Sequence, residues 1–142
     1  MKITIVTAFP EDIYDVRHRN LRQGQPKGTE KMPDIDNLAT TVHFLAKNGS
    51  VTIGCATLML ENNQDSRWRL RGMAVDVEFR QHGIGRQLLS AMLQYGNVAE
   101  EGLWCNARTS ARAFYEACGF VAEGKEFEIV PIGPHYVMRY NA

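Results

Sequence analysis

The chain has 142 residues, of which 44% are hydrophobic and 23% are charged, as is typical of one folded globular domain. This composition excludes disordered, collagen-like and coiled-coil chains. Sixteen Lys and Arg residues balance sixteen Asp and Glu residues, so the formal net charge of zero gives no overall field for nucleic acid or a membrane surface, and we expect neither as a partner.

The N-terminal part of the chain predicts a strand, a helix and a loop. Residues 2–6 are rich in β-branched side chains and predict a strand. Residues 11–22 follow Pro10, with acidic side chains at the start and arginines at the end, which is the charge order that stabilises a helix. Residues 23–37 contain two glycine turns and two prolines, and predict a loop with room for one short helical turn.

Three strand-like runs follow, at residues 38–47, 51–61 and 68–75. The first two flank Asn48-Gly49, a sequence typical of the tight turn of a hairpin. A polar turn separates the second run from the third. Together the three runs predict an antiparallel meander.

The C-terminal part predicts two helices and three more strands. Residues 83–95 form an amphipathic helix that packs on a sheet, because apolar side chains recur on one face: Ile84, Leu88, Met92 and Tyr95. A second helix begins at Thr109 or Ser110 and reaches Cys118, with Gly119 as its C-terminal glycine. The strands are predicted at residues 103–106, 120–129 and 135–140. No repeat or break in composition divides the sequence, so we expect a single domain over residues 1–142.

The sequence contains no segment typical of membrane insertion or export. The longest runs without charged residues, 48–60 and 87–99, are shorter and more polar than the roughly 20 apolar residues of a spanning helix. The N-terminus lacks the apolar region and cleavage site of an export signal. We therefore expect a cytoplasmic protein.

The three cysteines, Cys55, Cys105 and Cys118, are widely spaced among apolar neighbours. They form no CxxC pair of the kind that binds zinc or carries out redox chemistry. We interpret all three as buried thiols and expect no metal site.

The most informative segment runs from Arg80 to Arg86, where a strand leads through a glycine-rich turn into the helix at 83–95. Gly83 and Gly85 allow the backbone to approach a ligand closely, and the first helical turn offers unpaired N–H groups with a partial positive charge. This pattern predicts a phosphate or pyrophosphate site. The alternative is a plain strand-to-helix connection in which the glycines only relieve crowding.

Two common nucleotide motifs do not account for this turn. A GxGxxG dinucleotide motif would need a third glycine where Leu88 stands. The GxxxxGK sequence of a P-loop, followed by Ser or Thr, does not occur. Any phosphate at this turn should therefore belong to another ligand.

The run Arg80 to Gly85 resembles the acetyl-coenzyme A signature of the GCN5-related N-acetyltransferases (GNAT): Gln or Arg, two residues, Gly, one residue, then Gly or Ala. The resemblance continues through "RLRGMAV", "LWCNAR" and "SARAFYEACGF", and covers about half of the chain closely. It extends to "EFEIVPIGPHYVM" near the C-terminus. It implies an α/β (α+β) GNAT fold, with a mixed, mainly antiparallel central sheet of about seven strands, helices on both faces and splayed parallel strands in the middle.

The resemblance also implies acetyl-coenzyme A as cosubstrate. Met73 and Val75 would offer backbone groups to its pantetheine arm, while Ala74 would point away. Asn106 would bind the pantetheine region, although a simple strand-end cap is the alternative. The implied coenzyme-binding residues are Met73, Ala74, Val75, Arg80, Gln81, His82, Gly83, Ile84, Gly85, Arg86 and Asn106.

The activity implied is transfer of an acetyl group to a primary amine of a small molecule by direct attack. Tyr115 would be the general acid that gives a proton to the departing thiolate, a role that suits a phenol. From the residues alone, we would interpret Tyr115 as a half-buried core aromatic. The general base stays open among Glu61, Glu126, Glu128, His135 and a water chain.

The resemblance also implies that acceptor specificity comes from residues 11–22, the loop 23–37 and the last two strands, which border the thioester end of the family's cleft. Glu126 and His135 are the candidate acceptor-binding residues; Glu126, with Glu128, would favour a cationic amine. Arginines of the first helix could instead hold a carboxylate or phosphate: Arg17, Arg19 and Arg22. The alternatives are a non-catalytic acyl-coenzyme A sensor and a protein or peptide N-acetyltransferase, and a homodimer is compatible with each.

Overall fold

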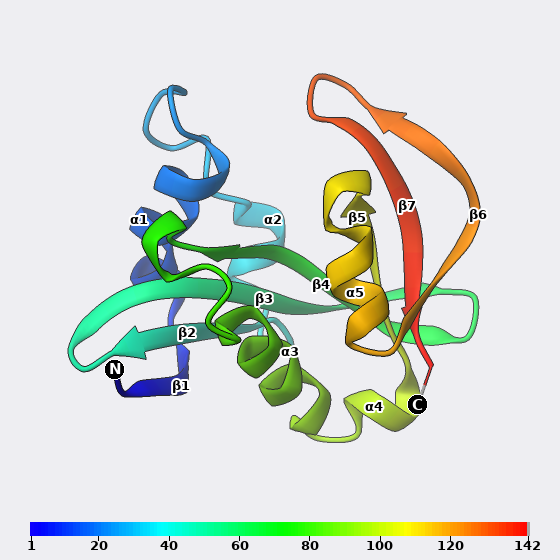
Figure 1. Cartoon of the computed structure of the whole chain (residues 1–142), viewed down its shortest axis with the longest axis horizontal. Coiled ribbons are helices and arrows are strands. Elements are labelled where there is room, and N and C mark those ends of the chain that lie inside the picture. Colours follow the sequence, from blue (N-terminus) through cyan, green and yellow to red (C-terminus); the bar gives the residue numbers. More distant parts are fainter. Residues whose placement is uncertain (142) are drawn as a thin grey trace.

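A mixed sheet passes through the whole molecule (Figure 1), and the computed structural model describes residues 1–141. In this part of the chain the sheet has seven strands in the order β1-β2-β3-β4-β5-β7-β6. The strands are β1 (Ile3–Ala8), β2 (Val42–Asn48), β3 (Val51–Asn63), β4 (Ser66–Val75), β5 (Leu103–Arg108), β6 (Phe120–Ile129) and β7 (Gly133–Tyr140). Neighbouring strands are antiparallel except β4 and β5, which are parallel. The prediction of a mixed, mainly antiparallel sheet is confirmed.

Helices cover both faces of this sheet, as predicted. They are α1 (Pro10–Leu21), α2 (Pro33–Asp36), α3 (Ile84–Gln94), α4 (Val98–Glu101) and α5 (Arg112–Ala117), and short 3₁₀ turns span Val77–Phe79 and Thr109–Ala111. On one face, Ile13 and Val16 of α1 pack against Leu45 and Cys55. On the other face, α3 and α5 pack on a larger apolar cluster with the sheet.

The parallel strands β4 and β5 stay together only briefly. Trp68 pairs with Leu103 and Arg69 pairs with Trp104, and beyond these two pairs the strands separate. Beyond that point β5 keeps its pairing with β7, and β4 keeps its pairing with β3. The edge of β4 that faces β5 is therefore open beyond Arg69, so its backbone groups are free to pair with something else.

A β-bulge in β4 changes the direction of the side chains along this open edge. Gly72 has a φ of +59°, a left-handed conformation that glycine adopts without strain. Leu70 packs on the α3 face and Ala74 packs under α1, although regular alternation would put both on the same face. The bulge thus lets one strand serve both faces of the sheet.

Some elements differ from the sequence-based prediction. Strand β2 begins at Val42, because residues 38–41 form a turn in which the Thr41 amide bonds to the Leu38 carbonyl at 3.0 Å. The predicted helix from Thr109 or Ser110 begins with a 3₁₀ turn, and the α-helix runs only from Arg112 to Ala117. The Thr109 hydroxyl does not cap it, because it donates to Glu126 on β6 at 2.8 Å.

Cys55 and Cys105 are buried as expected, but Cys118 is only partly buried, because it lies at the C-terminal end of α5. Among the described side chains, His, Cys, Asp and Glu do not gather in a group of three that could hold a metal ion. In residues 1–141 no helix is long and apolar enough to cross a membrane.

Candidate active site

Two cavities meet where β4 and β5 separate. The first, here called the helix cavity, has a volume of about 550 Å³ and lies at the N-terminus of α3. The second, here called the arginine cavity, has a volume of about 300 Å³ and lies between α1, β4, β5 and β7. Some residues line both cavities and so mark their junction: Leu21, Met73, Arg108, Ala111 and Tyr115.

The helix cavity contains most of the residues that the sequence predicted for coenzyme binding. All of them line it except His82 and Asn106. His82 is exposed, and its Nδ1 bonds to the Arg80 carbonyl at 2.9 Å, so its imidazole supports the turn from outside. Asn106 lines the arginine cavity instead.

The turn before α3 presents a row of free backbone donors to the helix cavity. Gln81 and Gly83 have φ values of +63° and +77°, and this left-handed backbone leads into the first turn of the helix. Within residues 1–141, the amides of residues 81–86 donate to no other residue. These amides and the partial positive charge of the helix N-terminus form a site suited to a phosphate or pyrophosphate.

Two arginines flank this turn, and both also bond to the backbone. Arg80 Nε donates to the Val75 carbonyl at 2.9 Å, and Arg86 Nη1 lies 3.4 Å from the Ala117 carbonyl. Both side chains line the helix cavity and are exposed, so they add positive charge at its mouth. On the other side of the cavity runs the open edge of β4, with Met73 and Val75.

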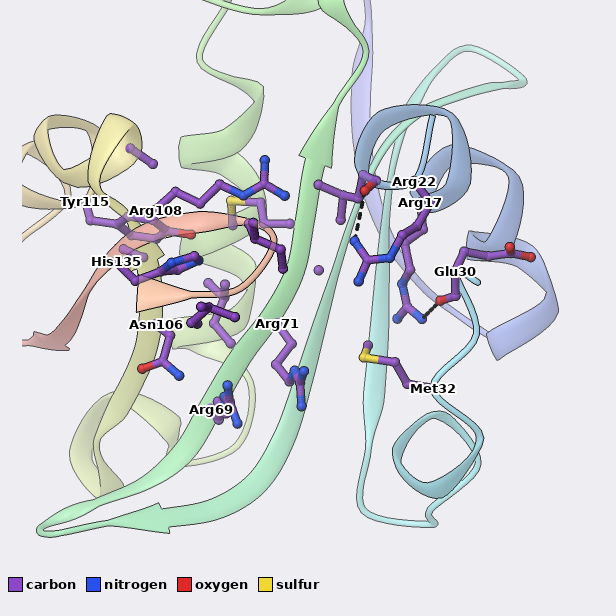
Figure 2. Close-up of a pocket in the computed structure, with 18 residues that line it drawn as sticks. Arg17, Arg22, Glu30, Met32, Arg69, Arg71, Asn106, Arg108, Tyr115 and His135 are labelled. Carbon is purple, nitrogen blue, oxygen red and sulfur yellow. Dashed lines mark hydrogen bonds between the residues drawn. The ribbon is translucent and has the colours of Figure 1, made fainter. Parts of the chain in front are cut away.

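Five arginines line the second cavity: Arg17, Arg22, Arg69, Arg71 and Arg108. Figure 2 shows them on three sides, with Arg17 and Arg22 from α1 and its C-terminal end facing Arg108 of β5 across β4. For an anionic group of the acceptor, the sequence offered only Arg17, Arg19 and Arg22. The structure places Arg19 outside both cavities, where it is paired with Asp76 at 2.7 Å.

Only part of the positive charge of the arginine cavity is balanced. Arg17 is paired with Asp36, and Arg69 Nη1 donates to both carboxylate oxygens of Glu61 at 3.1 Å. Within the described residues, the guanidinium groups of Arg71 and Arg108 have no hydrogen-bond or ion-pair partner. Burial lowers the pKa of Arg71, and the positive charge of Arg69 lowers it further.

The other side chains of this cavity leave that excess in place. Arg22 donates to the neighbouring Leu21 carbonyl at 2.9 Å. Glu30 also lines the cavity, but its carboxylate accepts from the Gly28 amide at 2.8 Å and is used within its own loop. The cavity is therefore suited to an anionic group.

His135 lies at the wall of the arginine cavity with only 4% of its surface exposed. Its Nδ1 is 2.7 Å from the Gly133 carbonyl. Because a carbonyl oxygen only accepts hydrogen bonds, Nδ1 carries the proton and Nε2 keeps its lone pair in the neutral ring. The histidine can therefore accept a proton at Nε2.

Tyr115 lies at the junction of the two cavities. Helix α5 holds its ring between Phe114 and Phe120, with centroid distances of 5.1 and 5.3 Å. Burial, and then the neighbouring Cys105 and Cys118 thiols, raise its pKa well above its usual range. The phenol is therefore protonated, and it can donate a hydrogen bond to a group at the junction.

The carboxylates proposed from the sequence lie elsewhere. Glu61 is held by Arg69, Glu126 accepts from Thr109, and Glu128 is exposed on β6. None of the three lines either cavity in the described part of the chain. Asn106, in contrast, has a buried side-chain oxygen that has no hydrogen-bond partner among residues 1–141, and it lines the arginine cavity.

Comparisons with known proteins agree with this fold. Residues 39–122 match a family model described as "Acetyltransferase (GNAT) domain". The chain is 29% identical over 141 residues to the uncharacterized N-acetyltransferase YitI of Bacillus subtilis, covering 96% of this chain and 94% of that protein. The fold is similar to a putative N-acetyltransferase from Lactobacillus plantarum, with a TM-score of 0.78 and 18% identity over 99% of this chain and 98% of that one. It is also similar to an aminoglycoside 6'-N-acetyltransferase complexed with coenzyme A, with a TM-score of 0.72 and 12% identity over 94% and 95% of the two chains.

Proposed function

Because the chain belongs to the GNAT family of acyl-coenzyme A-dependent N-acetyltransferases, we propose that it transfers an acetyl group to a primary amine of a small molecule that also carries an anionic group. The observation that carries this proposal is the unbalanced positive charge of the arginine cavity, next to the junction marked by Tyr115. A carboxylate, phosphate or phosphonate would pair with Arg71 and Arg108 there. A cationic amine without such a group would meet an excess of like charge, with Glu30 as the one carboxylate in the described lining of the cavity.

The helix cavity is the proposed site of acetyl-coenzyme A, which supplies the activated acetyl thioester. The free amides of residues 81–86 would bind its pyrophosphate, with Arg80 and Arg86 beside it. The open edge of β4 at Met73 and Val75 would pair with the pantetheine arm as a further strand would. This arrangement would direct the thioester toward Tyr115.

Acetyl transfer then needs a base, an acid and a donor for the oxyanion. His135 Nε2 would take the proton of the amine, whose nitrogen forms the new C–N bond by direct attack on the thioester carbonyl. A backbone N–H of β4 would stabilise the oxyanion. As the C–S bond breaks, Tyr115 would donate its proton to the departing sulfur.

The proposed acceptor class can be tested with four amines of the same three-carbon length: propylamine, 1,3-diaminopropane, β-alanine and 3-aminopropylphosphonate. We expect kcat/KM for the two anionic amines to exceed that of propylamine by about 10- to 100-fold, as one or two charge-assisted hydrogen bonds would give. Release of free thiol from acetyl-coenzyme A measures the rates. Equal rates for all four amines, or a preference for 1,3-diaminopropane, would contradict the proposal.

The same panel tests Arg71 directly. Arg71→Met keeps most of the apolar stem but removes the charge, so we expect KM for β-alanine and 3-aminopropylphosphonate to rise about tenfold or more. The rate with propylamine should stay close to that of the wild type, since this amine has no anionic group. An equal loss with all amines would mean that Arg71 supports the fold and not the acceptor.

The coenzyme site can be tested by placing a branched side chain in the turn before α3. Gly83 and Gly96 both have positive φ values, +77° and +49°, and an added Cβ would contact nothing within 4 Å at either position. The backbone strain of a valine is therefore similar at both, of the order of 1–2 kcal/mol, but only Gly83 lines the helix cavity. We expect Gly83→Val to raise the calorimetric Kd for coenzyme A at least about tenfold, and Gly96→Val to leave it unchanged. Equal binding by the two variants would place the phosphates elsewhere.

A further inference from the structure

The guanidinium of Arg17 is almost fully buried, with 2% of the residue exposed, although Arg17 lies on the wall of the arginine cavity. Its Nη1 donates to Asp36 Oδ2 at 2.8 Å and to the Glu30 carbonyl at 2.9 Å. Its Nη2 donates to Asp36 Oδ1 at 3.1 Å and to the Thr57 hydroxyl at 2.8 Å. The four hydrogens of Nη1 and Nη2 are therefore all donated to other groups of the protein. Arg17 differs in this from Arg71 and Arg108, whose guanidinium groups have no such partners within the described residues.

We propose that Arg17 is a positioning residue: its guanidinium, neutralised by Asp36, holds residues 22–37 against the arginine cavity and supports the β4 bulge beside Arg71. The effect of this positioning on acceptor binding rests on the function proposed above. The positioning itself is a property of the protein without ligand.

Residues 22–37 have few other contacts with the rest of the protein. Within the described residues these include His18 with the Gln25 carbonyl at 2.9 Å, His43 with the Asp36 carbonyl at 3.0 Å, and Lys31 over the Tyr14 ring. Residues 23–29 are exposed, and only Glu30 and Asp36 are fully buried in the segment. The Asp36 carboxylate that binds Arg17 also accepts from the Met32 amide at 2.8 Å. Since Glu30 and Met32 line the arginine cavity, the Arg17–Asp36 pair fixes the wall that they form.

On its other side, Arg17 lies against the bulge of β4. A Cβ at Gly72 would be 3.3 Å from Arg17 Nε, so the guanidinium lies beside the bulge, where the missing side chain of Gly72 leaves room for it. Thr57, which accepts from Arg17, is the register partner of Arg71 on the neighbouring strand. Arg17 therefore connects the segment after α1 to the part of β4 that carries Arg71.

A buried histidine completes a closed ring of hydrogen bonds. His43 Nδ1 is 2.8 Å from the Thr57 hydroxyl, and Nε2 is 3.0 Å from the Asp36 carbonyl. The carbonyl requires the proton on Nε2, so Thr57 donates to Nδ1 and its oxygen accepts from Arg17. Burial lowers the pKa of His43, and the neutral ring that results fits this pattern. The ring thus holds one positive and one negative charge.

Because the charges of Arg17 and Asp36 balance each other, an experiment can separate the positioning of residues 22–37 from the stability of the fold. The side chains of Arg17 and Asp36 are 3% and 0% exposed, so removing one of them would leave a buried charge without a partner and destabilise the fold. Replacing both by apolar side chains of similar size leaves no such charge, and buried pairs often tolerate that exchange. The double variant Arg17→Met/Asp36→Leu therefore removes the hydrogen bonds without isolating a charge.

We expect hydrogen exchange of the amides of residues 28–37 to be about tenfold faster or more in Arg17→Met/Asp36→Leu, with the amides of β3 unchanged. KM for β-alanine or 3-aminopropylphosphonate should rise about tenfold, while kcat and the Kd for coenzyme A stay within about threefold of the wild type. Arg139→Met/Glu123→Leu is the matched control, because this pair joins β6 to β7 outside both cavities, and it should change neither the exchange nor KM. A folded Arg17→Met/Asp36→Leu variant with wild-type exchange and KM would overturn the proposal.

If the double variant does not fold, Arg17→Lys decides the question. Lysine keeps the charge beside Asp36 but cannot reach Thr57, the Glu30 carbonyl and both Asp36 oxygens together. It should show the same faster exchange in residues 28–37, and wild-type exchange would overturn the proposal. If the wild-type protein acetylates none of the four amines, the proposed acceptor class is wrong, whereas the exchange rates still decide whether Arg17 positions the segment.

Discussion

Replacing Tyr115 by Phe is expected to lower kcat by about 100-fold or more, the range that a positioned general acid contributes, and to leave the Kd for acetyl-coenzyme A unchanged. The ring is held by Phe114 and Phe120, so phenylalanine keeps the packing and removes only the hydroxyl. Because the pKa of Tyr115 is raised, the hydroxyl is protonated across the neutral pH range and always available as a donor. Thiol release gives kcat, and calorimetry gives Kd.

Tyr140→Phe is the matched control for this experiment. Tyr140 belongs to the same aromatic group, 5.7 Å from Phe120, but it lies outside both cavities. The control should keep full turnover. A Tyr115→Phe enzyme that turns over at the wild-type rate, with the chemical step shown to be rate-limiting, would remove Tyr115 from the role of general acid.

The parts of the fold that the sequence predicted correctly are those encoded by neighbouring residues. The turn at Asn48-Gly49 joins β2 to β3, and Gly49 has a φ of +62°, as its sequence indicates. Gly119 has a φ of +93° and follows Cys118, the C-cap residue of α5, as a C-terminal glycine should. Helix α3 buries Ile84, Leu88 and Met92, which the helical period placed on one face.

The separation of β4 from β5 came only from the resemblance to the family. It depends on two strands far apart in the sequence that pair over just two residue pairs, and no local pattern contains that information. The bulge at Gly72 was also missed, since one glycine in a strand-like run does not specify a change of face. Gly72 itself was the one available signal that alternation along β4 would fail.

In the candidate site, too, the sequence predicted what lies in one continuous segment and missed what is assembled from distant segments. The turn from Arg80 to Arg86 is one continuous segment, so the sequence alone pointed to it. The arginine cavity is assembled from α1, β4, β5 and β7, and no local pattern in the sequence singles out Arg71 or Arg108. Only the sheet order, which places β5 between β4 and β7, brings them together with His135.

The largest effect on the proton transfer from the amine is expected for His135. His135→Asn removes the basic Nε2 but keeps an amide that can donate to the Gly133 carbonyl, as Nδ1 does at 2.7 Å. We expect kcat/KM with β-alanine or 3-aminopropylphosphonate to fall by about 100- to 10,000-fold at neutral pH, the usual contribution of a general base. Binding of coenzyme A should not change, since His135 lies outside the helix cavity.

The pH dependence distinguishes loss of a base from loss of structure. An amine without a base must lose its proton to water, and this becomes easier as the pH rises. The ratio of wild-type to His135→Asn rates should therefore shrink steadily with increasing pH, whereas a structural defect would lower the rate equally at every pH. Glu128→Gln, on the exposed side of β6, should follow the wild-type profile. A constant ratio for His135→Asn, or a wild-type rate at neutral pH, would assign the base to a water chain and leave His135 as part of the cavity wall.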